Sequence, residues 1–255
     1  MYTDCHSHIL PGIDDGAKTD DDALQMARMS VESGTTRVFA TPHGYTGQYH
    51  VKPGVTLRLA PSFNSLLRQS GIDLTVLPAM EVHHCVTAPD RVPVDVQRLR
   101  TGAALCYGAV PTTAEARYLL LEFDFEEWPP DARHVLRAFR EEGVRVVLAH
   151  PERYDAVVQD PGLIDLAIDE GAWLQITTGS ILGAFGHDAC DLSKRLLKQG
   201  KVHVIASDAH NAHKRPPGLA AAFAVVRDVW GLTAAADACV HNADQIWKSA
   251  IAYAR

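Results

Sequence analysis

Short apolar runs alternate with amphipathic segments along the whole chain. Apolar runs of about four to eight residues predict buried strands, and the amphipathic segments between them predict helices. This alternation is typical of repeated β-α units arranged as a parallel sheet or barrel. The predicted strands are residues 2–8, 37–40, 74–79, 118–123, 145–149, 173–177 and 202–206, with a weaker one near 103–107.

Several of the intervening helices have recognisable ends. Thr19 and the three aspartates after it can cap a first helix, in which Ala23, Met26 and Val31 share a face and which Gly34 ends. Later helices begin near residues 130, 161 and 188, and a glycine ends each of them. The last ~40 residues predict two further helices.

Composition adds limits to this picture. The chain has 255 residues, 47% of them hydrophobic, which suits one α/β barrel domain spanning residues 1–255. A formal charge of -7 without any Lys/Arg run argues against nucleic acid as a partner. No signal peptide or membrane-spanning run is evident, and the five scattered cysteines resemble reduced thiols. We therefore expect a cytoplasmic protein with no membrane insertion.

Ionisable residues follow the ends of the predicted strands. His43, Glu81, Glu122, His150 and Asp208 each come at or just after the end of an apolar run. The carboxyl ends of parallel barrel strands share one face, so these residues are expected to converge there. A carboxylate at such a place is costly to bury without a cation or hydrogen-bond donors.

Other histidines and carboxylates extend this group. His6 and His8 lie two residues apart on a strand, where both can face one ion, although the pattern alone is weak. Asp15 could equally belong to an ordinary solvated turn. The candidate ligands are His6, His8, Asp15, His43, Glu81, Glu122, His150, Asp208 and His210. Nine imidazole and carboxylate ligands without a thiolate suit two or three ions of Mn²⁺, Fe²⁺, Zn²⁺ or Co²⁺.

Two arginines lie near these ligands in the sequence. Arg153 is three residues from His150, and Arg215 follows His210. A guanidinium binds two phosphate oxygens at once, so arginines beside a metal cluster favour a phosphate ester as substrate. Arg215 could equally be a surface arginine in a loop. The chemistry expected is attack on phosphorus by a water that the metals activate, with no phosphoenzyme.

Together these motifs resemble the polymerase and histidinol phosphatase (PHP) family. The matching segments are HSHILPGIDDG at 6–16, ATPH at 40–43, LEF at 121–123, AHPER at 149–153 and ASDAHN at 206–211. Within that family they resemble the bacterial tyrosine-protein phosphatases that regulate capsule and exopolysaccharide synthesis. The resemblance implies a distorted TIM-like (β/α)₇ barrel with three metal ions, usually Mn²⁺.

The resemblance also implies roles for individual residues. His6, His8, Glu81 and Asp208 would hold one ion, and Glu81, Glu122 and His150 a second. Asp15, His43 and His210 would hold the third. Arg153 and Arg215 would bind phosphate as the catalytic arginines. The implied substrate is phosphotyrosine on a bacterial tyrosine autokinase, with a small phosphate monoester such as histidinol phosphate as the alternative.

The sequence departs from the family in one region. His83 and His84 are extra potential ligands, and residues 87–100 match no motif. His84-Cys85 followed by Arg91 has the spacing of the cysteine-dependent tyrosine phosphatases, but Pro89 and Asp90 are unsuited to a loop that wraps its N–H groups around phosphate.

Two other classes remain possible from the residues alone. Amidohydrolases share the His-x-His strand, yet they commonly use a barrel lysine that the predicted strands lack. A metal-binding scaffold without activity would require a broken ligand set, and every expected ligand is present.

Overall fold

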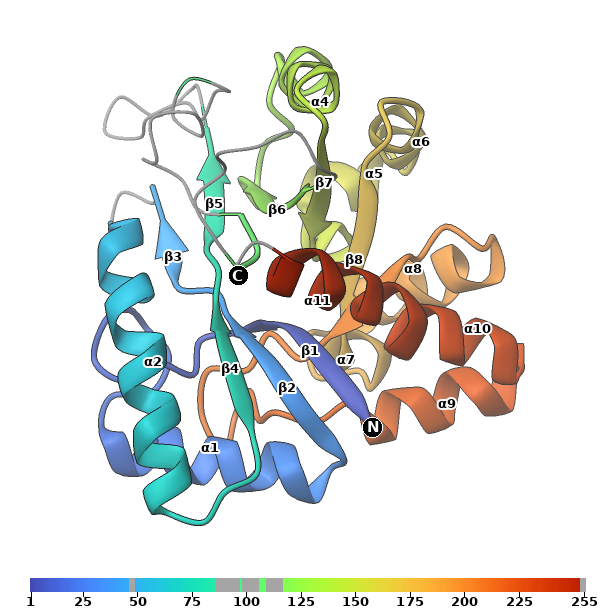
Figure 1. The fold of residues 1–255 in the computed structure, drawn as a ribbon. Coiled ribbons are helices and arrows are strands. Elements are labelled where there is room, and N and C mark those ends of the chain that lie inside the picture. The colour runs from blue at the N-terminus through green and yellow to red at the C-terminus, as the bar shows by residue number, and fades with distance from the viewer. Residues whose placement is uncertain (46–48, 86–96, 98–105, 109–116, 253–255) are drawn as a thin grey trace.

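The computed structural model describes residues 1–45, 49–85, 97, 106–108 and 117–252 (Figure 1). Its strands are all paired in parallel. They are β1 (Tyr2–Ser7), β2 (Thr35–Ala40), β3 (His43–Gly44), β4 (Thr75–Pro78), β5 (Glu81–His84), β6 (Arg117–Phe123), β7 (Val144–Ala149), β8 (Trp173–Thr177) and β9 (Val204–Ala206). The predicted strand near 103–107 lies mostly outside the described residues.

The strands form one closed barrel. They pair in the orders β1-β2-β4 and β3-β5-β6-β7-β8-β9, and β3 and β5 continue the lines of β2 and β4 after short breaks. A bridge between Ser7 and Ala209 closes the ring, with the N–H of His8 donating to the carbonyl of Ala209 at 2.8 Å. When β2 and β3 are counted as one strand, and β4 and β5 as another, the described strands form a ring of seven. The predicted distorted (β/α)₇ barrel is confirmed.

Helices cover the outside of this ring (Figure 1). They are α1 (Asp20–Glu32), α2 (Pro53–Gln69), α4 (Ala132–Glu141), α5 (Asp155–Gln159), α6 (Gly162–Asp169), α7 (Thr178–Ile181), α8 (His187–Lys198), α9 (Ala220–Trp230), α10 (Leu232–Ala236) and α11 (Asn242–Ala252), with short turns η1 (Pro151–Arg153) and η2 (Asp237–His241). None of the helices in the described part of the chain is long and apolar enough to cross a membrane.

The end of the chain follows its prediction of two helices. The first is α9, and the second is formed by α10, the π-helical turn η2 and α11, which follow one another without a break. Gly231, with a positive φ of 93°, ends α9. Beyond it Asp237 and Asn242, at the two ends of η2, both keep right-handed helical dihedrals, so the helix continues through the π-helical turn.

The first helix begins as its sequence predicts. The hydroxyl of Thr19 accepts from the N–H of Asp22 at 3.2 Å, and the Asp22 carboxylate accepts from the N–H of Thr19 at 3.0 Å. This reciprocal pair satisfies two N–H groups that a helix start otherwise leaves free. Ala23 and Met26 are buried on the face that packs on the barrel.

Inside the barrel, the inward-facing side chains differ between the two ends of the strands. On β6, Tyr118 and Leu120 belong to an interior apolar cluster, and Glu122 is the next residue on the same face. On the last strand, Val204 and Ala206 precede Asp208 in the same way. The side chains are therefore apolar at the amino ends of the strands and ionisable at the carboxyl ends.

Helix α11 packs against the apolar end and runs across the strands in Figure 1. Its Trp247 meets the ring of Phe39 on β2 edge-on at 5.1 Å, and Ile246 belongs to the same cluster. Apolar packing thus fills one end of the barrel and leaves the ionisable residues to the other end.

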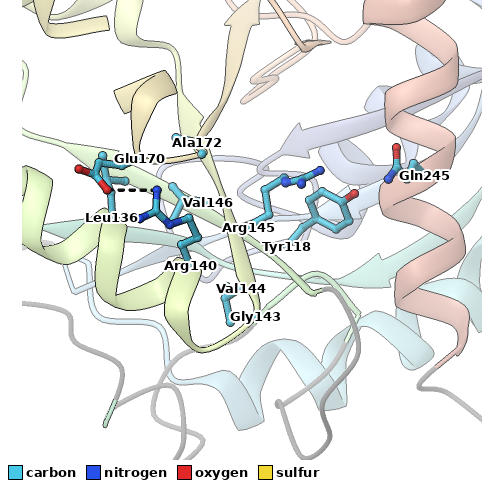
Figure 2. A pocket seen from close by; sticks show the side chains of 11 residues that line it. Tyr118, Leu136, Arg140, Gly143, Val144, Arg145, Val146, Glu170, Ala172 and Gln245 are labelled. Carbon is cyan, nitrogen blue, oxygen red and sulfur yellow. Dashed lines mark ion pairs between the residues drawn. The ribbon is translucent and has the colours of Figure 1, made fainter. Parts of the chain in front are cut away.

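A pocket of about 430 Å³ opens near the amino ends of β6, β7 and β8 (Figure 2). Glu170 is buried there and pairs with Arg137 at 2.7 Å and Arg140 at 3.2 Å. The pocket's carboxylate is therefore already neutralised by arginines. It lies at the opposite end of the strands from the ionisable residues, so we assign it no part in their chemistry.

Tyr154 ties the ends of two strands together beneath the ionisable residues. Its buried hydroxyl donates to the carbonyl of Ala149 at 2.6 Å and accepts from the N–H of Phe123 at 3.0 Å. Tyr154→Phe leaves that N–H without a partner, so we expect unfolding free energy to fall by about 1–3 kcal/mol in urea denaturation. Tyr2→Phe, on a half-buried ring packed against Phe223, is the matched control. Equal losses in the two variants would contradict this account.

Candidate metal centre

Glu81 lies at the centre of a group of imidazoles. Its carboxylate is fully buried and lies 2.9 Å from His43 Nδ1, 2.9 Å from His150 Nε2 and 3.2 Å from His6 Nε2. His8 Nε2 lies 3.3 Å away. Four imidazoles from three different strand ends thus meet one carboxylate.

The rings of His6 and His8 face each other through two nitrogens that are both acceptors when the rings are neutral. Their Nε2 atoms are 3.2 Å apart. Each ring donates its other N–H outward, from His6 Nδ1 to Gln175 Oε1 at 2.9 Å and from His8 Nδ1 to Asp14 Oδ2 at 2.7 Å. In neutral rings both Nε2 atoms therefore carry lone pairs that point at each other and at Glu81. Such a convergence of acceptors fits a divalent cation.

Asp15 joins two further histidines at one side of this group. Its Oδ1 lies 3.3 Å from His43 Nε2 and 3.4 Å from His210 Nε2. His210 donates its Nδ1–H to the backbone carbonyl of Asp208 at 3.0 Å, which turns its Nε2 toward Asp15. Donor atoms of His8, Asp15, His43 and His210 lie within 4.8 Å of one another, as a single ion requires.

On the other side, Asp208 and Glu122 complete the set. Asp208 Oδ1 lies 3.3 Å from His6 Nε2, and Glu122 Oε1 lies 3.4 Å from His150 Nε2. All nine residues that the sequence singled out as candidate ligands therefore lie in one connected group. The donor set is imidazole and carboxylate without thiolate, as expected for a hard or borderline divalent cation.

Both predicted arginines reach the same carboxylate. Arg153 Nη1 donates to Asp208 Oδ2 at 2.9 Å, and Arg215 Nη2 pairs with that oxygen as well. The guanidinium of Arg153 lies 4.8 Å from the ring centre of Phe125 and 4.1 Å from that of Phe185. Arg215 lies 5.7 Å from Phe185. The aromatic rings fix the planes of both guanidiniums next to the histidine group.

Two of the residues in the group have left-handed backbones. His150 has φ 32° and Asp208 has φ 53°, although neither is glycine. Each such residue costs about 1–3 kcal/mol and persists only where its surroundings hold it. His150 directly follows β7, and Asp208 lies two residues after the end of β9, so the backbone turns sharply where each side chain enters the group.

The carboxylates and histidines of the group shift one another's pKa values. Burial alone would lower the pKa of His6, but the charges of Glu81 and Asp208 outweigh it and raise that pKa to about 9. Burial opposes ionisation of Asp208, yet the charges of His6 and Arg215 hold its pKa well below the usual range. Asp208 therefore stays ionised at neutral pH, as a carboxylate that binds a cation must.

His210 behaves differently from His6. Burial lowers its pKa, and the charge of neighbouring His8 lowers it further, to about 4. Its ring is therefore neutral at pH 7, and the lone pair of Nε2 faces Oδ1 of Asp15, a second acceptor 3.4 Å away. A neutral imidazole is the form that binds a metal.

The sequence did not predict the residues that hold the candidate ligands and the arginines in position. Asp14 and Gln175 each accept an N–H from a histidine of the group, and Phe185 packs on both arginines. Gln175 had a usable signal, because it is a polar residue on the inward face of an apolar strand. Asp14 had none, since two adjacent aspartates in a turn look alike in sequence.

The extra histidines and the cysteine lie beside the group. His83 Nδ1 is 2.9 Å from Glu122 Oε2, and donor atoms of His83, Cys85 and Asp124 lie close together. His84 turns outward to Asp131 at 3.0 Å. Cys85 is 2% exposed. Arg91 and the segment 87–100 lie outside the described residues.

Comparison with known proteins identifies the family. The family described as capsular polysaccharide synthesis, CpsB/CapC, matches residues 2–248. The chain belongs to the CpsB/CapC family. It is 34% identical to the tyrosine-protein phosphatase YwqE of Bacillus subtilis, over 83% of this chain and 78% of YwqE. It is 25% identical to the tyrosine-protein phosphatase CpsB of Streptococcus pneumoniae, over 95% of this chain and 97% of CpsB.

Solved structures agree with this membership of the CpsB/CapC family. A crystal structure from work on YwqE and CpsB, described there as metal-dependent tyrosine phosphatases, superposes with a TM-score of 0.81 at 31% identity, over 98% of this chain and 92% of that one. A lactonase of Listeria monocytogenes matches with a TM-score of 0.53 at 11% identity, over 94% of this chain and 92% of that one. The second likeness shows the barrel fold alone.

Asp14 orients His8, so removing its charge should weaken metal binding. We expect Asp14→Asn to lower Mn²⁺ affinity by about 10- to 100-fold, because the partner of a ligating histidine sets its orientation and basicity. Calorimetric titration of the metal-depleted protein measures this. Asp20→Asn, at an exposed position in the first turn of α1, is the control. Unchanged affinity in Asp14→Asn would contradict a ligating role for His8.

Proposed function

We propose that this chain is a metal-dependent protein-tyrosine phosphatase. The observation that carries the proposal is the convergence of nine histidines and carboxylates with two arginines at one end of the barrel. The chain's similarity to YwqE and CpsB, both tyrosine-protein phosphatases, supports the same activity. The activity is hydrolysis of a phosphoric monoester.

The nine residues would hold two or three divalent ions, and Mn²⁺ is our proposal for their identity. His6, His8, Glu81 and Asp208 would hold one ion, Glu81, Glu122 and His150 a second, and Asp15, His43 and His210 a third. When bound, such ions supply Lewis acidity and lower the pKa of a coordinated water. Oxygen and imidazole donors without thiolate suit Mn²⁺.

The chain's own cations would bind the phosphoryl group. Arg153 and Arg215 both reach Asp208 Oδ2, so their remaining N–H groups are available beside the ligands. A phosphate placed there would accept from both guanidiniums, and their charge would offset the charge that builds on its oxygens. Phe125 and Phe185 hold Arg153 between them, so little ordering is needed when substrate arrives.

The substrate we propose is phosphotyrosine on a bacterial tyrosine autokinase that controls capsule or exopolysaccharide synthesis. The family description and the tyrosine phosphatase relatives support it. A phenolate leaving group has a pKa of about 10 and leaves with less assistance than an alkoxide. We also propose that the protein acts in the cytoplasm and that residues 1–255 form a single domain.

Metal removal and substrate choice test this function together. We expect EDTA to reduce hydrolysis of a phosphotyrosine peptide to background and Mn²⁺ to restore it, because the ionised carboxylates need a cation. The reconstituted protein is then compared on phosphotyrosine peptide, phosphoserine peptide and histidinol phosphate by phosphate release. Full activity in EDTA would refute the metal mechanism, and a preference for histidinol phosphate would refute the proposed substrate.

Arg153→Ala and Cys85→Ser separate the two routes to tyrosine phosphatase activity. We expect Arg153→Ala to lower kcat/KM on phosphotyrosine peptide by about a hundredfold or more, because a donor to the charged oxygens is lost. Cys85→Ser should leave kcat/KM within about twofold, since a metal mechanism needs no thiolate. Circular dichroism checks that both variants fold. The reverse pattern would indicate a cysteine mechanism.

A further inference from the structure

An apolar pocket of about 390 Å³ lies next to the arginines. Its walls come from α7 and the loop after it, from the loop after β9, and from the start of α9. Leu182, Phe185, Pro217 and Ala221 are among its lining residues, and Leu182 is 50% exposed. An open pocket with this lining buries apolar groups favourably.

The pocket and the phosphate-facing arginines share residues. Arg215 lines the pocket and also pairs with Asp208. Phe185 lines the pocket and also packs on the guanidiniums of Arg153 and Arg215, at 4.1 Å and 5.7 Å. A phosphate bound by the arginines would therefore lie within a few ångströms of the pocket's edge.

Buried hydrogen bonds fix the pocket wall relative to the arginines. Glu152, the residue before Arg153, accepts from the backbone N–H of Thr177 at 2.9 Å and from the hydroxyl of Ser180 at 2.7 Å. Helix α7 and the loop that carries Leu182 and Phe185 are thus attached to the same turn as Arg153. The pocket is a preformed part of the site's edge.

The charges around the pocket suit an anionic polypeptide. Among the described residues that line it, Lys214 and Arg215 are cations and none is a carboxylate. The chain as a whole carries a formal charge of -7, so this local balance differs from the rest of the protein. Opposite charge favours a phosphorylated segment over an uncharged one.

We propose that this pocket binds an apolar side chain next to the phosphotyrosine of the substrate polypeptide. The inference rests on the proposed function and adds a sequence preference to it. Extended residues rise about 3.3–3.6 Å each, so a residue one or two positions from the phosphotyrosine can reach a pocket that begins at Phe185. The pocket would select phosphotyrosine segments flanked by leucine-like residues over polar ones.

The test compares two phosphotyrosine peptides and one small aryl phosphate on metal-reconstituted protein. One peptide carries leucine at the two positions on each side of the phosphotyrosine, and the other carries serine there. We expect wild-type kcat/KM to be about tenfold higher for the leucine peptide, mainly through KM, because apolar burial favours binding. Leu182→Ser should remove most of this preference and leave hydrolysis of p-nitrophenyl phosphate unchanged.

Leu232→Ser is the matched control, since Leu232 is a 64% exposed leucine on α10 outside the pocket lining. Equal wild-type rates on the two peptides would overturn this inference alone, and that comparison needs no variant. If Leu182→Ser and Leu232→Ser retain the preference for the leucine peptide to the same degree, this inference is also overturned. A wild-type protein that hydrolyses neither peptide overturns the proposed function, and this inference falls with it.

Discussion

The burial of Glu81 is the constraint on which the rest of this site depends. A carboxylate without solvent exposure is costly unless positive charge or donors surround it. Four imidazoles, from β1, the β2–β3 line and the end of β7, meet it within 3.3 Å. Each of these strands must end where its histidine can reach Glu81. The breaks between β2 and β3 and between β4 and β5 lie at this level of the barrel.

The sequence predicted the candidate ligands and the two arginines, but it did not reveal the residues that hold them in place. An ionisable residue two positions beyond an inward apolar one, as Glu122 is beyond Leu120, predicts convergence because every parallel strand ends on the same face. Asp14 and Phe185 could not be found this way, because their roles depend on distances between loops. The π-helical turn inside the last helix was not predicted either, because the helical pattern of the sequence continues through it.

The barrel itself does not decide the chemistry. A lactonase of 11% identity shares the fold. In this chain two arginines meet Asp208, and no described strand carries the lysine that amidohydrolases commonly use. Two guanidiniums held by phenylalanine rings at the edge of the group suit a dianionic substrate.

The bridge between Ser7 and Ala209 has a consequence for biosynthesis. It joins the first strand to the end of the last one, so the centre combines residues that lie far apart in the chain. Contacts of such long sequence separation form late in folding. A nascent chain still lacking β9 holds His6 and His8 without Asp208 and His210. The ion sites that use Asp208 or His210 can therefore be completed only after β9 has been synthesised.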